Sequence, residues 1–318
     1  IPGTRNRSYL YIYNPGTKLS QPLTAGSQSA SLHAISPDGR RVLFSVSRQD
    51  YSEVPFSKQT LYELEISTMQ LDTIWKDKLY GGSCQYSPDG TQLLVSGGPE
   101  TFGTIGVKVS EGRIPNSYDT QLFMFDLKTR KAEPLTRNFE PAAGMAHWAP
   151  DGKIYLTATE RDYVNLYRLD PKKRSFTKID VPVEVITSAD FAENKTVAVL
   201  RGTSISTPEK LYALDLATGK SSLLSDPGAD RMADVLSGRT EEWNFKNSRG
   251  TTIYGRVYYP VNYDPSKKYP LIVNFYGGTT PTDRSFGGRY PKGIWAAEGY
   301  MVYVMQPSGS TGFGQDFS

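Results

Sequence analysis

Apolar and polar residues alternate along most of the first 238 residues, in runs too short for helices. Five of these runs begin with Leu followed by Tyr or Phe, at positions 10, 61, 122, 166 and 211. Each run leads through polar turn residues into another apolar run, as Leu211–Leu216 leads through Thr218–Lys220 into Leu223 and Leu224. A period of two residues predicts half-buried strands, and the short polar connections predict hairpins.

A second phrase, Pro-Asp-Gly, alternates with the first. It occurs in Ser36–Gly39, Ser87–Gly90 and Ala149–Gly152, and Glu193–Lys195 is a degraded fourth copy. Pro sets its own φ, Asp bonds to nearby backbone and Gly adopts the left-handed conformation, so the phrase predicts a tight turn. Each full copy is followed by an apolar run. One unit of the repeat is therefore four short antiparallel strands.

The spacing of the repeat predicts a β-propeller. The Leu-aromatic runs follow one another at steps of 51, 61, 44 and 45 residues. A period near 45 with four strands per unit is typical of propeller blades. About five blades are recognisable and the first is incomplete, because the chain starts at Ile1 inside a hairpin; we expect a trimmed, partial propeller. The longest step holds a polar insertion, Pro99–Thr120, which is either a substrate-side loop or a longer surface hairpin.

The pattern changes after residue 238. Two antiparallel strands are predicted first, and then a nearly continuous apolar strand that ends at two glycines and should be covered on both faces. A helix with Pro in its first turn and Gly299 as its cap precedes another buried strand. These segments are Glu242–Lys246, Thr252–Pro260, Leu271–Tyr276, Pro291–Glu298 and Met301–Met305. The order strand, loop, helix, strand predicts the start of an α/β domain. We expect domains at 1–238 and 239–318.

Composition excludes several classes of function. The 36 basic and 33 acidic residues leave a charge of +3, which gives no footprint for nucleic acid, and Lys172–Arg174 is predicted to be a solvated hairpin tip. No apolar run approaches the roughly 18 residues that a membrane span needs. The single Cys84 excludes an intrachain disulfide and a cysteine metal cluster, and we expect it to be buried. We expect no cofactor and no metal.

Two parts of the chain carry a family resemblance. The Pro-Asp-Gly turns with their apolar strands resemble the repeats of translocation-associated periplasmic propellers and of the prolyl oligopeptidase superfamily. The segments Tyr269–Gly278 and Pro307–Phe317 resemble the opening of that superfamily's catalytic domain, most closely in its dipeptidyl peptidase IV and acylaminoacyl peptidase branches. The two parts cover essentially the whole chain. The resemblance implies an all-β propeller followed by the opening of an α/β-hydrolase domain.

The resemblance also implies an activity. It implies a serine peptidase that releases dipeptides or other short peptides from oligopeptides, with the propeller gating access to the hydrolase site. Peptide substrates are the expected partners, and a homodimer is a further expectation because members of the superfamily often dimerise. A periplasmic or secreted location is favoured. Substrate preference and the choice between exopeptidase and endopeptidase stay open.

The catalytic triad is not found in this sequence. The superfamily's nucleophile lies on a G-x-S-x-G turn, which does not occur here, and its Asp and His lie further along. The two histidines, His33 and His147, come just before propeller turns, and we expect both to be structural. The adjacent acidic pair Glu241–Glu242 lies outside the propeller, so we do not assign it to a substrate amine. The 318 residues alone are expected to be inactive.

One catalytic element is implied by the resemblance. Tyr276 matches the Tyr that donates its hydroxyl to the oxyanion in the dipeptidyl peptidase IV branch; the alternative is a strand-end Tyr that packs on neighbouring structure. Thr279 and Ser308 stand where the family usually has Pro and Arg. These departures and the missing triad leave a second hypothesis open. It is a non-catalytic propeller that binds a peptide or protein partner.

Overall fold

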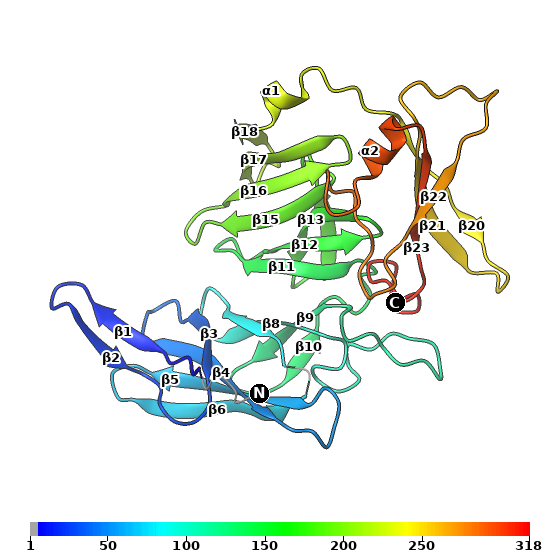
Figure 1. The fold of residues 1–318 in the computed structure, drawn as a ribbon. Helices are drawn as coiled ribbons and strands as arrows, with labels where there is room; N and C mark the ends of the chain where they lie inside the picture. The colour runs from blue at the N-terminus through cyan, green and yellow to red at the C-terminus, as the bar shows by residue number, and fades with distance from the viewer. Residues whose placement is uncertain (1–5, 80) are drawn as a thin grey trace. The chain divides into compact units, whose positions relative to one another are not determined.

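The protein is built mainly of β-strands, which form several sheets with mostly antiparallel neighbours (Figure 1). A computed structural model describes residues 6–79 and 81–318. Its chain divides into two compact units, residues 1–108 with 120–138 and residues 109–119 with 139–318. This division falls inside the predicted propeller, so the boundary after residue 238 stays a prediction. Ile1, on which the expected trimmed start depends, lies outside the described residues.

The first unit holds a hairpin and two four-stranded sheets. The hairpin pairs β1 (Tyr11–Asn14) with β2 (Leu19–Pro22). One sheet consists of β3 (Ala30–Ile35), β4 (Arg41–Gln49), β5 (Ser57–Glu65) and β6 (Gln70–Lys78). The other consists of β7 (Ser83–Tyr86), β8 (Gln92–Gly97), β9 (Gln121–Asp126) and β10 (Ala132–Pro134). In both sheets each strand pairs antiparallel with the next strand along the chain, as predicted for a blade.

The second unit repeats this arrangement twice. One set of strands is β11 (Ala142–Trp148), β12 (Ile154–Glu160), β13 (Tyr163–Asp170) and β14 (Ser175–Ile179). The next is β15 (Val185–Phe191), β16 (Val197–Ser204), β17 (Thr207–Asp215) and β18 (Ser221–Ser225). A single parallel pair, Val164 with Val185, joins the two sets. The described chain therefore contains four four-stranded sets and one two-stranded hairpin, in agreement with about five units of which the first is incomplete.

The Pro-Asp-Gly phrase forms the tight turn that the sequence predicts. In the first copy the Ser36 hydroxyl donates to Asp38 Oδ1 at 2.6 Å and accepts the Arg41 amide at 2.9 Å. The Asp38 carboxylate also accepts the Arg40 amide, and Gly39 has a left-handed φ of 72°. The second copy has the same bonds: the Ser87 hydroxyl donates to Asp89 Oδ1 at 2.6 Å and accepts the Gln92 amide at 3.0 Å.

The third copy has Ala149 in place of the turn serine. Here the Tyr155 hydroxyl donates to Asp151 Oδ2 at 2.9 Å, while the Lys153 amide donates to Asp151 Oδ1. The hydrogen bond to Asp151 and burial raise the pKa of Tyr155 to about 12, with burial the larger cause. The turn is kept because Pro, Asp and Gly still set its backbone, and Gly152 has a φ of 77°.

The leucines of the Leu-aromatic runs lie in the sheet cores. Leu61, Leu122 and Leu166 are fully buried, and Cys84 is buried as expected. Burial raises the pKa of the Cys84 thiol, so this cysteine acts as a small apolar core residue. The leucines at the start of these three runs are therefore in the core as predicted, whereas β1, β2 and β18 are exposed along their whole length.

The last 80 residues form a different, mixed sheet. Its elements are β19 (Thr240–Glu242), β20 (Phe245–Lys246), β21 (Thr252–Tyr258), β22 (Leu271–Asn274), α2 (Lys292–Ala297) and β23 (Met301–Gln306). The strand order is β19-β21-β23-β22, with β21 antiparallel and β22 parallel to β23. The predicted helix is confirmed, and Gly299 follows its C-cap residue Glu298 with a left-handed φ of 92°. A short helix, α1 (Ala229–Met232), was not predicted.

One expectation was wrong in part. The continuous apolar strand is shorter than predicted, and Leu271 and Val273 of β22 are 59% and 50% exposed. Only alternate residues face the core, where Ile272 packs against Val302 and Val304, so one face of β22 is uncovered in the described chain. The insertion adds no strand of its own: residues 98–120 form turns that connect the antiparallel pair β8 and β9, so both interpretations of it stay open.

Candidate functional site

Tyr276 lies two residues beyond the end of β22, at the start of a long irregular connection to α2. We call residues 275–290 the tyrosine loop. The Tyr276 side chain is 56% exposed, and its hydroxyl has no hydrogen-bond partner among the described residues. A phenol in this position is available to a ligand. Its role in the oxyanion site stays a prediction.

The second glycine after Tyr276 is required by the position of the aromatic ring. A Cβ atom on Gly278 would lie 2.3 Å from Cε1 of Tyr276, well inside van der Waals contact. A Cβ on Gly277, by contrast, would meet nothing within 4 Å. The ring therefore lies back over its own loop, and a larger residue at position 278 would move the ring from this position.

The Gln306 side chain of β23 and the backbone after β23 hold the tyrosine loop. The Thr311 amide donates to the Thr279 carbonyl at 2.9 Å. The Gln306 side-chain amide accepts from the Thr282 amide at 2.9 Å and donates to the Thr282 carbonyl at 2.7 Å. Gln306 is buried and satisfies both backbone groups of one loop residue. The loop has no regular structure, and these side-chain bonds replace the ladder that a strand would have.

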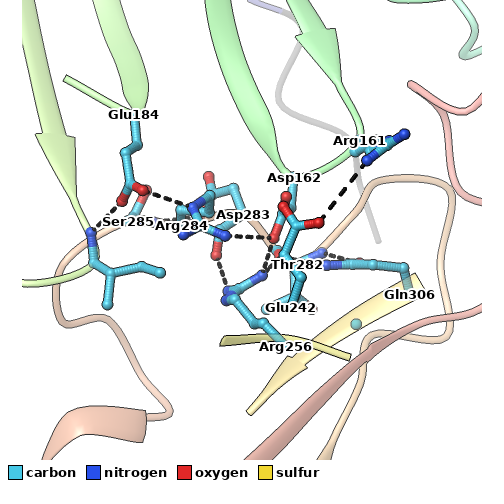
Figure 2. Close-up of polar contacts among 12 residues, drawn as sticks. Arg161, Asp162, Glu184, Glu242, Arg256, Thr282, Asp283, Arg284, Ser285 and Gln306 are labelled. Atoms are coloured by element: carbon cyan, nitrogen blue, oxygen red, sulfur yellow. Dashed lines mark hydrogen bonds and ion pairs between the residues drawn. The ribbon is translucent and has the colours of Figure 1, made fainter. Parts of the chain in front are cut away.

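Arg256 of β21 is the central contact of the same loop. It is 0% exposed, and its guanidinium donates to the carbonyls of Thr282, at 3.0 Å, and of Asp283 (Figure 2). The same group pairs with Asp162 at 2.5 Å, and its Nε donates to the Tyr258 hydroxyl. A fully buried cation is stable only when it is paired and hydrogen-bonded, and Arg256 meets both conditions.

A second arginine, in the loop itself, extends this group of charges. Arg284 pairs with Glu184 at 2.9 Å and with Asp162 at 3.5 Å, as Figure 2 shows. Burial lowers the pKa of Arg284, but the carboxylates of Asp162 and Glu184 outweigh burial and raise it above its ordinary value. Asp162 lies in the turn between β12 and β13, and Glu184 directly precedes β15. We call Asp162, Glu184, Arg256 and Arg284 the ion cluster.

The insertion of the second blade also reaches the C-terminal segment of the chain. Residues 109–119, which belong to the second unit, contact residues 309–318. The Asp316 carboxylate accepts the Ser110 amide at 2.7 Å and the Ser110 hydroxyl at 3.0 Å, and Arg113 donates to the Asp316 carbonyl. The Asn116 side chain donates to the Gly309 carbonyl at 3.3 Å. We call residues 109–119 the arm.

Both histidines contact residues of the sheets, and their expected structural role stays a prediction. His33 Nε2 lies 2.8 Å from the Ser45 hydroxyl, and its Nδ1 accepts the Cys84 amide at 3.2 Å. Burial lowers the pKa of His33, which keeps the ring neutral. His147 stacks on Phe191 at 5.3 Å between ring centroids, and its buried Nε2 has no hydrogen-bond partner in the described chain.

The adjacent acidic residues Glu241 and Glu242 contact nearby side chains. Glu241 accepts from the Tyr259 hydroxyl and pairs with Arg239, and Glu242 lies 4.0 Å from Arg161.

Across residues 6–79 and 81–318 no three His, Cys, Asp or Glu side chains gather in a way that could hold a metal ion. In the same residues, no helix combines the length and apolarity required to span a bilayer.

Sequence reasoning missed the ion cluster entirely. The residues that pair in it lie far apart in the sequence. Arg256 and Asp162 are 94 positions apart, and Arg284 and Glu184 are 100 positions apart. Each is an ordinary charged residue in its own segment. No local pattern could have joined them, because the contact depends on how the mixed sheet lies against the loops of β11–β18.

Comparison with known proteins relates this chain to peptidases. No family model matches it. It is 24% identical to dipeptidyl-peptidase 5 of Porphyromonas gingivalis over 291 residues. This alignment covers 89% of the chain. Its fold matches crystal structures of Porphyromonas gingivalis dipeptidyl peptidase 4 (12% identity, TM-score 0.61) and Pyrococcus horikoshii acylaminoacyl peptidase (16% identity, TM-score 0.62). Each structural match covers 97% of this chain.

The relatives are considerably longer. The chain spans 40% of the length of the Porphyromonas dipeptidyl-peptidase 5, and 56% of each of the two matched structures. At these identities the structural likeness establishes a shared fold. The antiparallel sheets of this chain match the propeller part of those structures.

Proposed function

We propose that this chain, which is similar to dipeptidyl and acylaminoacyl peptidases, is part of a serine peptidase of the prolyl oligopeptidase family. The proposed enzyme releases dipeptides or other short peptides from oligopeptides. The observation that carries the proposal is Tyr276, an exposed phenol without a hydrogen-bond partner in the described chain, at the end of a sheet strand and beside two glycines. Peptides are the proposed substrates, and a homodimer is the proposed assembly.

We assign residues 239–318 to the opening of an α/β-hydrolase domain and residues 1–238 to a propeller. The support is the parallel pair β22 and β23, connected through α2, in a sheet that otherwise is antiparallel. Parallel neighbours need a crossover connection, and a helical crossover is the basic unit of α/β folds. The exposed Leu271 and Val273 of β22 are consistent with further structure on this side of the sheet in the full-length protein.

The proposed chemistry is acyl transfer. A serine of the full-length protein attacks the peptide carbonyl with a histidine as its base, and an aspartate orients that histidine. Negative charge then develops on the carbonyl oxygen. The Tyr276 hydroxyl donates a hydrogen bond to that oxygen and stabilises it, which is the largest single contribution in many such sites. The propeller restricts entry to short or flexible peptides.

The test compares two tyrosines of the same loop in the full-length protein. We expect Tyr276→Phe to lower kcat for an oligopeptide substrate by roughly 10²- to 10³-fold, because one oxyanion donor is lost. KM should change little, since the bond forms mainly in the transition state. Tyr290→Phe is the matched control, because Tyr290 is also exposed and its hydroxyl has no hydrogen-bond partner among the described residues. It should leave kcat unchanged.

Labelling by a fluorophosphonate separates the main hypotheses. A serine peptidase reacts with the probe through its nucleophile. A full-length protein that hydrolyses peptides and is labelled, but whose Tyr276→Phe variant keeps full kcat, would contradict the oxyanion role alone. A folded full-length protein that binds peptide without labelling or hydrolysis would instead support the non-catalytic propeller.

A further inference from the structure

We propose that the ion cluster positions the tyrosine loop, so that Asp162 and Glu184, two carboxylates from the blade connections, are positioning residues for Tyr276. The inference rests on the proposed peptidase function. The inference adds Asp162 and Glu184 to the residues on which the proposed reaction depends. Both lie far from Tyr276 in the sequence and belong to no motif. The cluster acts on the loop through Arg256 and Arg284.

The loop depends on a small number of side-chain anchors. Residues 275–290 contain no strand or helix, so no ladder of backbone bonds fixes them. Arg256 holds two successive carbonyls, those of Thr282 and Asp283, six and seven positions after Tyr276. The Arg284 amide donates to the Asp162 carbonyl at 3.2 Å, and the Phe286 amide donates to the Thr203 hydroxyl at 3.1 Å. Most of these anchors lie in one short stretch.

Asp162 connects the two arginines. Its Oδ2 is 2.5 Å from Arg256 Nη1 and 3.5 Å from Arg284 Nη1, while its own carbonyl accepts the Arg284 amide. A guanidinium is planar and its donors have fixed directions, so Asp162 sets the plane in which Arg256 presents its other donors to the loop. Neutralising Asp162 would leave Arg256 buried without its ionic partner and would alter that plane.

Glu184 fixes the second arginine to a blade turn. Its Oε1 accepts from Arg284 Nε at 2.9 Å, and its Oε2 accepts the Ile205 amide at 2.8 Å. Ile205 lies in the turn between β16 and β17. The carboxylate therefore couples the loop to two blade connections, one before β15 and one after β16.

The form of the cluster favours positioning over simple stabilisation. Buried ion pairs add little net stability compared with apolar contacts of the same volume, but they define geometry. Catalysis is sensitive to geometry, since a misplacement of about 1 Å can lower a rate by roughly 10²-fold. The cluster therefore has its main effect on the turnover of the full-length enzyme.

The test is a double-mutant cycle in the full-length enzyme. Asp162→Asn should lower kcat by roughly 10- to 100-fold, with KM changed less than about threefold. Glu184→Gln, which leaves the Arg256–Asp162 pair intact, should give a smaller loss of about 3- to 10-fold and serves as the second variant if Asp162→Asn fails to fold. Glu209→Gln is the matched control, because its pair with Arg201 is about half exposed. It should leave kcat unchanged.

The decisive measurement combines these changes with Tyr276→Phe. If the carboxylates act through Tyr276, each double variant should lose no more activity than Tyr276→Phe alone, because interacting groups are not additive. Multiplied losses, or full kcat in both single carboxylate variants of an active enzyme, would overturn the positioning role and leave the proposed function intact. A folded wild-type protein that neither hydrolyses peptides nor reacts with a fluorophosphonate would overturn both.

Discussion

The Pro-Asp-Gly turns and the tyrosine loop are both irregular segments, but they are held in opposite ways. In the turns, the side-chain bonds join residues two to five positions apart, as from Ser36 to Asp38 and from the Arg41 amide to Ser36. In the loop, the bonds join residues 94 and 100 positions apart. The first kind of segment can form with its own hairpin. The second requires distant parts of the chain to be folded first.

This difference separates scaffold from site. Each turn exposes its Pro and Asp, is repeated, and is held mainly by bonds within its own hairpin. Three members of the ion cluster, Asp162, Arg256 and Arg284, are buried and share partners, so a change at one of them affects the others. The comparison predicts that single substitutions will have large effects around the loop and small effects in the turns, and the following experiments test that order.

The largest effect is expected from Arg256→Met. The change leaves Asp162 buried without its main partner and removes two bonds to the tyrosine loop. Breaking a buried pair by removing one partner typically lowers the free energy of unfolding by about 3–5 kcal/mol. Urea denaturation measures this change in the free energy of unfolding. Arg201→Met is the control, since its pair with Glu209 is about half exposed and should be worth less than about 1 kcal/mol. Equal losses would contradict the comparison.

An intermediate effect is expected at the arm. Burial raises the pKa of Asp119 to about 6, although the Ser318 hydroxyl donates to its carboxylate and opposes the shift. The folded state then holds a proton that the unfolded state has lost, so stability should fall as pH rises from about 4 to about 6. With about 1.4 kcal/mol for each pKa unit, the loss is on the order of 3 kcal/mol.

Asp119→Asn should remove this pH dependence. The amide needs no ionisation, so above pH 6 the variant should have the higher free energy of unfolding, by an amount on the order of 1–3 kcal/mol. Denaturation at pH 4, 6 and 8 provides the measurement. Asp126→Asn is the control, because Asp126 is partly exposed and local hydrogen bonds to Thr129 lower its pKa. If Asp119→Asn keeps the slope of the wild type, the assignment to Asp119 is wrong.

The smallest effect is expected in a turn. Ser87→Ala removes one bond to Asp89 and one from the Gln92 amide, which should lower the free energy of unfolding by about 1 kcal/mol. The pKa of Asp89 should rise toward its ordinary value, because the Ser87 hydroxyl is the largest cause of its lowering. An NMR titration of the Asp89 carboxyl group measures this pKa. Ser67→Ala, which removes only a bond to Glu65, should change stability by less than about 0.5 kcal/mol.

The blades could be predicted in detail. Alternation placed Leu61, Leu122 and Leu166 in the cores, and the Pro-Asp-Gly phrase located the turns, because both depend on residues close together in the chain. The helix before β23 was likewise predictable from Pro291 and Gly299, whose conformational limits act on their own segment.

The sequence was less informative about surfaces. The run Leu271–Tyr276 is apolar throughout, yet β22 stops at Asn274 and exposes Leu271 and Val273. Apolar character shows that a strand can be buried, but the elements packed beside it decide which face is covered. The sequence of the insertion shows only that it is polar and rich in glycine. It could not predict the bonds to Asp316, because they connect positions about 200 residues apart.

Two kinds of information therefore specify this protein. The sequence by itself determined the repeated four-stranded units, their turns, the start of the mixed sheet and the candidate Tyr276, because periodicity, turn chemistry and motif are local properties. Only the tertiary structure decided which charges meet around the tyrosine loop. A lone Asp162 or Arg256 has no preferred partner in the sequence, and the pairing arises when folding removes both from water, where an unpaired charge is too costly to keep.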